Sequence, residues 1–329
     1  MSRFTRAAAT MHTLSLASME EASRFGVRDA DIDHLLLAIA IDPDIGGQVL
    51  REMGVGLDAA RTAVSEQHAA QLQLLGLASG DSGPGRIIFQ ETSGYEWTDR
   101  ALTVLKKASS GRQRGDSAAV LRALVDEPSG LIEAILRRLN VDPALVRSRL
   151  DEVQRLLPPT SSTAHEEMNL SGPRSIFVPA SPPAVWELLS SPARIPEWDQ
   201  SIARVDSANP AADSWTAETL TMAPNGKPIR VKQDFRRQRV ELVEQEQHSR
   251  ITWRFSHPDS SRSNPRVIAF VIEHAAGGTQ LQVTITFDTS RRRRTLARRV
   301  LRIPMRPLYR FAFFIQLAQL ESSIGRVFR

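Results

Sequence analysis

The chain has 329 residues, enough for two domains of ordinary size, and its hydrophobic fraction of 41% and charged fraction of 24% are those of a globular protein. It contains no cysteine, which excludes disulfides, thiolate metal ligands and cysteine nucleophiles. No apolar run approaches the roughly 20 residues that span a bilayer, and residues 1–19 lack the apolar core of a signal peptide. We therefore expect a cytoplasmic protein.

Apolar residues recur at helical spacing through the first half of the chain. Leu35, Leu36 and Ile39 fall at such spacings, and so do Leu50 and Met53. The segment Asn140-Val-Asp-Pro143 places an N-cap residue just before a proline at the first helical position. These patterns predict an all-α first domain.

The helical part also repeats itself. Residues 47–55 are similar to residues 131–141, with Leu50 matching Leu136 and Val55 matching Val141. A duplicated helical unit packs as a pseudo-symmetric bundle, because each copy supplies the apolar face that the other needs. We expect such a bundle, with a shortened second copy.

Two stretches have the composition of linkers. Residues 75–94 are rich in glycine and serine, and residues 157–173 contain Pro158-Pro-Thr-Ser-Ser-Thr163. The second stretch separates helical from strand-like sequence. The predicted organisation is a helical domain over 1–157, a linker over 158–173, and a second domain over 174–329.

The period of the apolar residues changes from helical to two after the linker. Alternation over 229–235, 251–255 and 281–287 predicts half-buried antiparallel strands. Gly277-Gly278 and Asn225-Gly226 are typical of hairpin turns. A helix is expected from about Leu308 to Phe328.

The first domain resembles the Clp N-terminal repeat domain over residues 3–155. The resemblance rests on Phe25-Gly26, on Ile32-Asp33-His34-Leu35-Leu36-Leu37, and on Trp97-Thr98 at the start of the second copy. In that family the domain precedes an ATP-driven unfoldase and captures substrates, degradation tags and adaptors. The resemblance implies Clp protease components, substrates or adaptors as partners.

Some members of that family bind phosphorylated arginine through an acidic residue just before the histidine of each repeat. Here the resemblance assigns that position to Asp33, next to His34, and makes these two residues a candidate peptide or phosphoarginine-like site. In the second copy the same positions are Ala118 and Ala119, so the second site is lost. The alternatives are that Asp33 is a helix N-cap and His34 a structural histidine.

The second domain resembles the SRPBCC, or START-like, helix-grip superfamily. This rests on residues 175–189, which combine a strand with a proline-bounded helix, and on Ile195-Pro-Glu-Trp198. The resemblance implies an α+β fold in which an antiparallel sheet curls around a long C-terminal helix and leaves a cavity for a hydrophobic small molecule. The candidate cavity residues, each of which has core packing as its alternative, are Trp198, Phe235, Trp253, Phe255, Phe287, Phe311 and Ile315.

Several catalytic motifs are missing from the sequence. It has no GxxxxGK[ST] phosphate loop, and therefore no P-loop ATPase, and it has neither HExxH nor GxSxG. We predict no catalytic residue, no metal site and no cofactor. Five side chains of the second domain could do acid–base work if the fold brought them together, namely Asp199, Glu218, Asp234, Glu273 and His274.

Positive charge concentrates near the C-terminus. The net charge is +5, yet the last 39 residues contain 11 arginines and one acid, Glu321. The candidate patch for an anionic partner comprises Arg291, Arg292, Arg293, Arg294, Arg298 and Arg299. A solvated helix face is the favoured interpretation, a membrane surface ranks second, and nucleic acid ranks third.

The leading functional hypothesis is a non-enzymatic adaptor or sequestering protein. Its first domain would bind a peptide, an adaptor or a Clp-directed small molecule, and its second domain a hydrophobic small molecule. One alternative is a cyclase- or hydrolase-like helix-grip enzyme with an attached interaction module. Another is a lipid-responsive peripheral membrane protein.

Overall fold

The chain folds into two compact units in a computed structural model, Met1–Glu167 and Met168–Arg329. The structure describes residues 3–77, 85, 87, 94–110, 116–156, 174–207, 209, 212–223, 226–260, 263–288 and 316–329. The predicted linker over 158–173 lies outside these residues, and so do Phe311, Ile315 and every arginine of the candidate anionic-partner patch. Each unit is considered by itself below.

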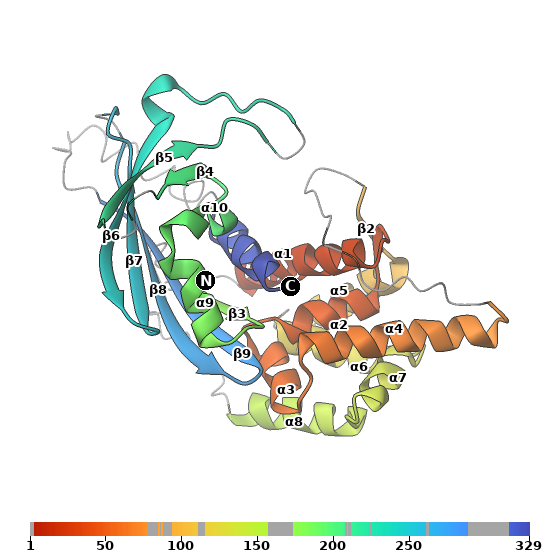
Figure 1. Cartoon of the computed structure of the whole chain (residues 1–329). Helices are drawn as coiled ribbons and strands as arrows, with labels where there is room; N and C mark the ends of the chain where they lie inside the picture. Colours follow the sequence, from red (N-terminus) through yellow and green to blue (C-terminus); the bar gives the residue numbers. More distant parts are fainter. Residues whose placement is uncertain are drawn as a thin grey trace. The chain divides into compact units, whose positions relative to one another are not determined.

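The first unit is helical, as the spacing of its apolar residues predicts (Figure 1). Two short strands, β1 (Asp29–Ala30) and β2 (Glu96–Trp97), pair in parallel and join its two halves. Its helices are α1 (Arg3–Arg24), α2 (Ile32–Ala40), α3 (Ile45–Glu52), α4 (Leu57–Leu74), α5 (Asp99–Ser109), α6 (Ser117–Val125), α7 (Leu131–Arg138) and α8 (Pro143–Leu156).

Helix α2 is the centre of this unit, since all nine of its residues are buried. Every residue of α2 except Asp33 and His34 is apolar, and the helix contacts α1 and α3 to α7, which is the environment that so apolar a helix requires. The buried Arg51 of α3 caps the C-terminal end of α2. Its guanidinium donates to the carbonyl oxygens of Ala40 and Asp42, each at 2.8 Å. Burial lowers the pKa of Arg51 to about 10.

Helices α3 and α7 end in the same way. The backbone N–H of Val55 donates to Leu50, and that of Val141 donates to Leu136, both at 2.9 Å. The preceding residues, Gly54 and Asn140, both have positive φ, at 83° and 58°. This is the Schellman motif, in which a left-handed residue turns the chain so that the last carbonyl groups of the helix find donors. The residue pairs that match in the sequence are the apolar positions of this motif.

The second unit is built on one antiparallel sheet, again as its alternation predicts. Its seven strands lie in the order β3-β9-β8-β7-β6-β5-β4. Their bounds are β3 (Arg174–Val178), β4 (Ile202–Asp206), β5 (Ser214–Thr219), β6 (Arg237–Glu246), β7 (Arg250–Ser256), β8 (Arg266–Ala275) and β9 (Gly278–Phe287). The helices are α9 (Pro182–Ser190), α10 (Ile195–Trp198), the 3₁₀ turns η1 (Pro192–Arg194) and η2 (Gln233–Phe235), and a C-terminal helix over residues 316–327.

One face of this sheet forms the core of the unit, with α9, α10 and the C-terminal helix on the same side (Figure 1). The alternating residues Ile251, Trp253 and Phe255 of β7 are all buried there. Leu317, Leu320 and Ile324 of the C-terminal helix join the same buried cluster. A sheet with a helix packed along its buried face is consistent with a helix-grip fold.

The strand predicted over residues 229–235 is wrong. Ile229 is 42% exposed, and residues 233–235 form the turn η2. Strand β6, the partner of β5, begins only at Arg237, so residues 229–235 lie in the connection between two strands, where Met222 and Pro228 form only an isolated bridge. Alternation of apolar and charged residues indicates a strand only where a neighbour completes the ladder.

A hairpin turn joins β8 to β9 as predicted, but its loop is Ala276 and Gly277, and Gly278 is already the first residue of β9. Gly278 lies very close to β3, and an added Cβ would overlap the carbonyl oxygen of Val178 and lie 2.9 Å from the ring of Phe177. Only glycine allows this approach of two backbones.

We expect Gly278→Ala to destabilise the second unit by about 1–3 kcal/mol, because backbone atoms must move to admit the methyl group. The measurement is the urea midpoint of the full chain followed by tryptophan fluorescence. The control is Gly325→Ala in the C-terminal helix, where the nearest atom would be 3.9 Å away. Alanine favours helix, so this change should be neutral or stabilising by up to about 1 kcal/mol. Equal losses in the two variants would contradict the close approach.

Candidate functional site

The buried face of the second unit is lined by aromatic rings from several elements. Trp198 at the end of α10 meets Phe270 of β8 at 5.4 Å between ring centroids, and Phe255 of β7 at 6.2 Å, both nearly perpendicular. Trp215 of β5 lies 5.8 Å from Trp253 of β7. The structure therefore brings together the predicted residues Trp198, Trp253 and Phe255.

Trp215 and Phe270 were not predicted as members of this cluster. The signal for Phe270 is present in the sequence, because Ile268, Phe270 and Ile272 alternate along β8 and all three are buried. Trp215 had no comparable signal, since only Ala217 follows it on the buried side of β5.

Two predicted cavity residues lie elsewhere. Phe235 is half-buried in η2 and is not part of the buried cluster; its ring contacts His257, with 4.9 Å between the centroids and 59° between the rings. Phe287 is 43% exposed, although Ile285, two residues earlier on the same side of β9, is buried. Phe287 is the last residue of its strand, where the sheet ends opposite Arg266. Both predictions relied on alternation, which does not show where a strand begins or ends.

The indole N–H groups of this cluster differ in their partners. Trp253 donates to the carbonyl oxygen of Leu189, and Trp215 to that of Asn209, each at 2.9 Å. Trp198 Nε1 is also buried, but it has no hydrogen-bond partner among the described residues. A buried donor without an acceptor is uncommon and costs free energy. Among the described residues, Trp198 thus presents a donor without an acceptor in an apolar environment.

Asp199, which follows Trp198, is the only fully buried carboxylate among the described residues of this unit. One of its oxygens accepts from the backbone N–H and the hydroxyl of Ser201, at 3.0 and 2.7 Å, and the other pairs with Arg266. The Arg266 guanidinium also lies 4.7 Å from the centre of the Phe255 ring. The charge of Asp199 is therefore compensated within the fold.

The other candidate acid–base residues are not gathered at this cluster. Glu218 is exposed and pairs with Arg204 at 2.9 Å, while Asp234, Glu273 and His274 are exposed. Within the described ranges, no group of three or more histidine, aspartate and glutamate side chains is placed to hold a metal ion.

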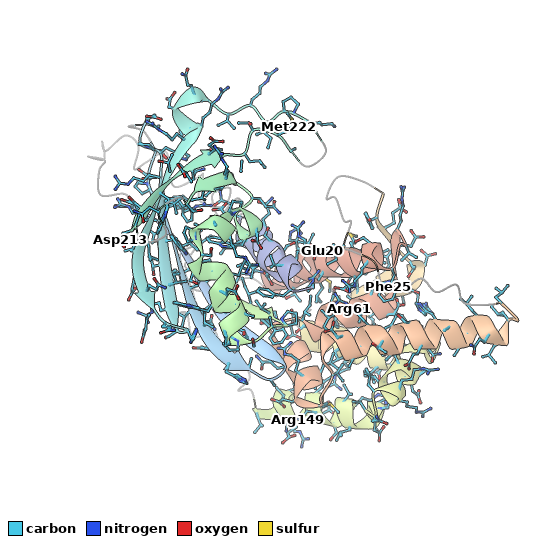
Figure 2. The ribbon with its side chains drawn as sticks, in the orientation of Figure 1. Glu20, Phe25, Arg61, Arg149, Asp213 and Met222 are labelled. Carbon is cyan, nitrogen blue, oxygen red and sulfur yellow. The ribbon has the colours of Figure 1, made fainter. Side chains whose placement is uncertain are left out.

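The second candidate site is a buried carboxylate in the first unit. Asp33 is 2% exposed, and its Oδ2 lies 2.8 Å from Nε2 of His68 on α4. Its Oδ1 accepts the backbone N–H of His34 at 2.8 Å, with His34 Nδ1 at 3.0 Å. Phe25, which Figure 2 labels, packs against His34 with 5.6 Å between the ring centroids and an angle of 73° between the rings. His68 is 39% exposed, so of this pair only the histidine has substantial contact with solvent.

Asp33 is not the N-cap of α2. Asp31 precedes the first helical residue, and Asp33 is the second residue of the helix. Asp31 pairs with Arg100 and accepts from the Thr98 hydroxyl at 2.6 Å, so it links α2 to the start of α5. In the second half Asp116 caps α6 by accepting the Ala119 N–H at 3.0 Å. A cap thus stands before both helices, whereas the Asp-His pair is present only in the first.

The ionisation of this cluster depends on its histidines. Burial opposes the charge of Asp33, but hydrogen bonds from His34 and His68 outweigh it and hold the pKa of Asp33 well below its usual range. The hydrogen bond to Asp33 raises the pKa of His68, although partial burial opposes this. The structure favours an anionic Asp33 beside a cationic His68.

We expect His68→Gln to alter how stability depends on pH. Because the pKa of His68 is raised in the folded state, its contribution is complete below the unfolded value of about 6.5 and is lost as pH rises through the folded value. The contribution of Asp33 to stability does not change between pH 6 and pH 9, because its lowered pKa affects stability only in acid. The free energy of unfolding of the wild type should therefore be higher than that of the variant by up to about 1 kcal/mol near pH 6, after allowance for solvent screening. The difference should be smaller near pH 9.

The measurement is the urea midpoint at both pH values. His274→Gln, a change of an exposed histidine on β8, is the control for loss of a histidine as such. A difference between wild type and His68→Gln that does not shrink as pH rises would contradict the ion pair.

Comparison with curated proteins finds no match to this chain. No helix in the described ranges combines the length and the apolar character needed to cross a membrane.

Several solved structures are similar over a little under half of the chain. A protein from Chromobacterium violaceum is 13% identical, with 47% of this chain and 95% of that one covered and a TM-score of 0.31. DynU16 from the dynemicin biosynthetic locus is 14% identical, with 46% and 45% covered and a TM-score of 0.30. The N-terminal domain of the chaperone ClpD from Arabidopsis thaliana is 20% identical, with 47% and 93% covered and a TM-score of 0.31.

A family match covers most of the second unit. Residues 172–312 match the family described as polyketide cyclase / dehydrase and lipid transport. The match begins just before β3 and includes all seven strands of the sheet. Residues 172–312 therefore form a domain of the polyketide cyclase, SRPBCC-like family.

Proposed function

We propose that this protein is a non-enzymatic adaptor or sequestering protein with two binding sites. Its second unit holds a hydrophobic small molecule against the buried aromatic face of the sheet. Its first unit binds a peptide, an adaptor or a Clp-directed small molecule. The observation that carries the proposal is the Trp198 N–H, which has no partner among the described residues and lies in an aromatic cluster beside a buried carboxylate, Asp199, that is already paired.

The family of the second unit supports a hydrophobic ligand, since its description includes lipid transport. Sites of this kind combine apolar walls with a few polar groups that fix orientation. Trp198, Phe255 and Phe270 supply apolar surface, and Trp198 Nε1 supplies one directional donor. The ligand that fits is therefore largely apolar and carries a hydrogen-bond acceptor.

The pairing of Asp199 supports binding over catalysis. A general acid or base must be free to exchange a proton, whereas Asp199 accepts from Ser201 and is neutralised by Arg266. The family description also names cyclases and dehydrases, so a helix-grip enzyme is the alternative. That enzyme would convert the bound molecule, which makes turnover the observable that separates the two functions.

The first unit is proposed to be a duplicated Clp-N-like bundle. The helices α2, α3 and α4 recur as α6, α7 and α8, and the shared Schellman motif supports common descent of the two halves. A phosphoarginine-like group would reach Asp33 only by displacing His68, which lies partly exposed above it. Because Ala118 and Ala119 replace the Asp-His pair in the second half, we propose a single site.

Native mass spectrometry of the full chain tests the second site. We expect a non-covalent adduct that is lost under denaturing conditions and is weaker in Trp198→Phe, because the ring remains but its donor is gone. Trp97→Phe in the first unit is the matched control and should retain the adduct. Hydrogen exchange should slow in β7 to β9 when the extracted molecule is added back. An empty spectrum with no such protection would contradict the site, and chemical conversion of the molecule would favour the enzyme.

Titration calorimetry with a phosphoarginine peptide tests the first site. We expect binding to the full chain and at least a tenfold loss in Asp33→Asn, because the carboxylate is the group that would pair with the guanidinium. Asp58→Asn removes a carboxylate that is 95% exposed on α4 and is the control. Equal affinity of wild type and Asp33→Asn would exclude Asp33 as the contact. Absence of any binding would exclude this class of partner while leaving the second site unaffected.

A further inference from the structure

Strand β8 places an arginine on the buried face of the sheet. Ile268 and Phe270 are buried there, and Arg266 lies on their side of the strand because side chains alternate. In the sheet Arg266 is opposite Phe255 of β7 and Phe287 of β9, the two strands that flank β8 in Figure 1. Residues paired across strands point to the same face. A guanidinium therefore lies between two phenylalanines at one end of the aromatic face.

This end of the face is open to solvent. The side chain of Arg266 is 21% exposed and Phe287 is 43% exposed. The next pair on the same face, Ile268 and Ile285, is buried. The face thus changes, over a distance of two residues along the strands, from a charged and exposed end to an apolar and covered interior.

Asp199 holds the guanidinium of Arg266 but uses few of its donors. Nη2 of Arg266 donates to Oδ2 of Asp199, while Oδ1 of Asp199 accepts from Ser201. An arginine has five N–H donors, and among the described residues Nε and Nη1 of Arg266 form no hydrogen bond. Pairing with Asp199 therefore orients Arg266 and leaves donors for a second anion.

A further donor lies against the same aromatic ring. Trp198 packs on Phe255 at 6.2 Å between centroids, and the Arg266 guanidinium lies 4.7 Å from the centre of that ring. The buried Nε1 of Trp198 has no partner among the described residues. Two side chains that contact Phe255 thus carry N–H groups for which the described part of the chain supplies no acceptor.

We propose that the molecule bound by the second unit is an amphipathic carboxylic acid, and that Arg266 binds its carboxylate. The inference rests on the proposed binding of a hydrophobic molecule to this face and specifies the class of that molecule. A carboxylate matches the planar guanidinium and accepts charge-assisted hydrogen bonds from it. Its apolar chain would lie along the aromatic face. A cationic amphiphile fits poorly because Arg266 would repel it, and an alcohol would leave the arginine charge without a second counterion.

Titration calorimetry of the full chain with decanoate, decanol and decylamine tests the proposal at pH 8 and low salt. We expect decanoate to bind at least about tenfold more tightly than decanol, because charge-assisted bonds to Arg266 add to the same apolar contact. Arg266→Gln should remove this preference by weakening decanoate alone. The matched control is Arg254→Gln on β7, because Arg254 is opposite Val267 on the other face of the sheet and is also ion-paired, with Asp288 at 3.3 Å.

A second variant separates binding from folding. Arg266→Gln leaves the buried Asp199 without its cation, so Asp199→Asn/Arg266→Gln, which removes both charges, is measured beside it and should show the same loss of preference. Equal affinities of the wild type for decanoate and decanol would overturn the inference and leave the hydrophobic site standing. A preference for decanoate that persists in both Arg266 variants would do the same. Binding of none of the three molecules would instead overturn the proposed site of the second unit, and this inference with it.

Discussion

Burial of one face of the seven-stranded sheet is the constraint on which the second unit depends. Alternate residues of β7, β8 and β9 are apolar and need a cover, and α9, α10 and the C-terminal helix provide it. The hydrogen bond from Trp253 to Leu189 then links the sheet to the end of α9. Because close packing must accommodate the backbone as well, Gly278 is required where β9 meets β3.

The first unit depends on the burial of α2 in the same way, but there the burial includes charge. A carboxylate on a fully buried helix is costly unless cations or donors compensate it, and Asp33 is compensated by His34 and His68. Glu21 and Arg61 form a second buried pair, with two hydrogen bonds at 2.8 and 2.9 Å, which joins α1 to α4. The pairs Asp33–His68 and Glu21–Arg61 therefore each join two helices and help to fix how these helices are placed.

The two candidate sites use polar groups differently. In the second unit the buried carboxylate is paired, and the group without a partner among the described residues is a neutral donor, Trp198 Nε1. In the first unit the buried carboxylate is paired with a histidine that is 39% exposed. The buried carboxylates of both sites are therefore engaged by partners within the fold.

The sequence by itself determined the order of a helical unit and an antiparallel sheet, the hairpin between β8 and β9 near Gly277, and the buried positions of Trp198, Trp253 and Phe255. These follow from periodicity, turn chemistry and short-range similarity, all of which are local properties of the chain. Only the tertiary structure decided which residues meet across elements. It placed His68 on Asp33 and Arg266 on Asp199, pairs separated by 35 and 67 positions. It also placed Phe287 at an exposed end of its strand and residues 229–235 outside the sheet. A side chain is buried by the groups that pack against it, and the neighbouring residues in the sequence do not specify those groups.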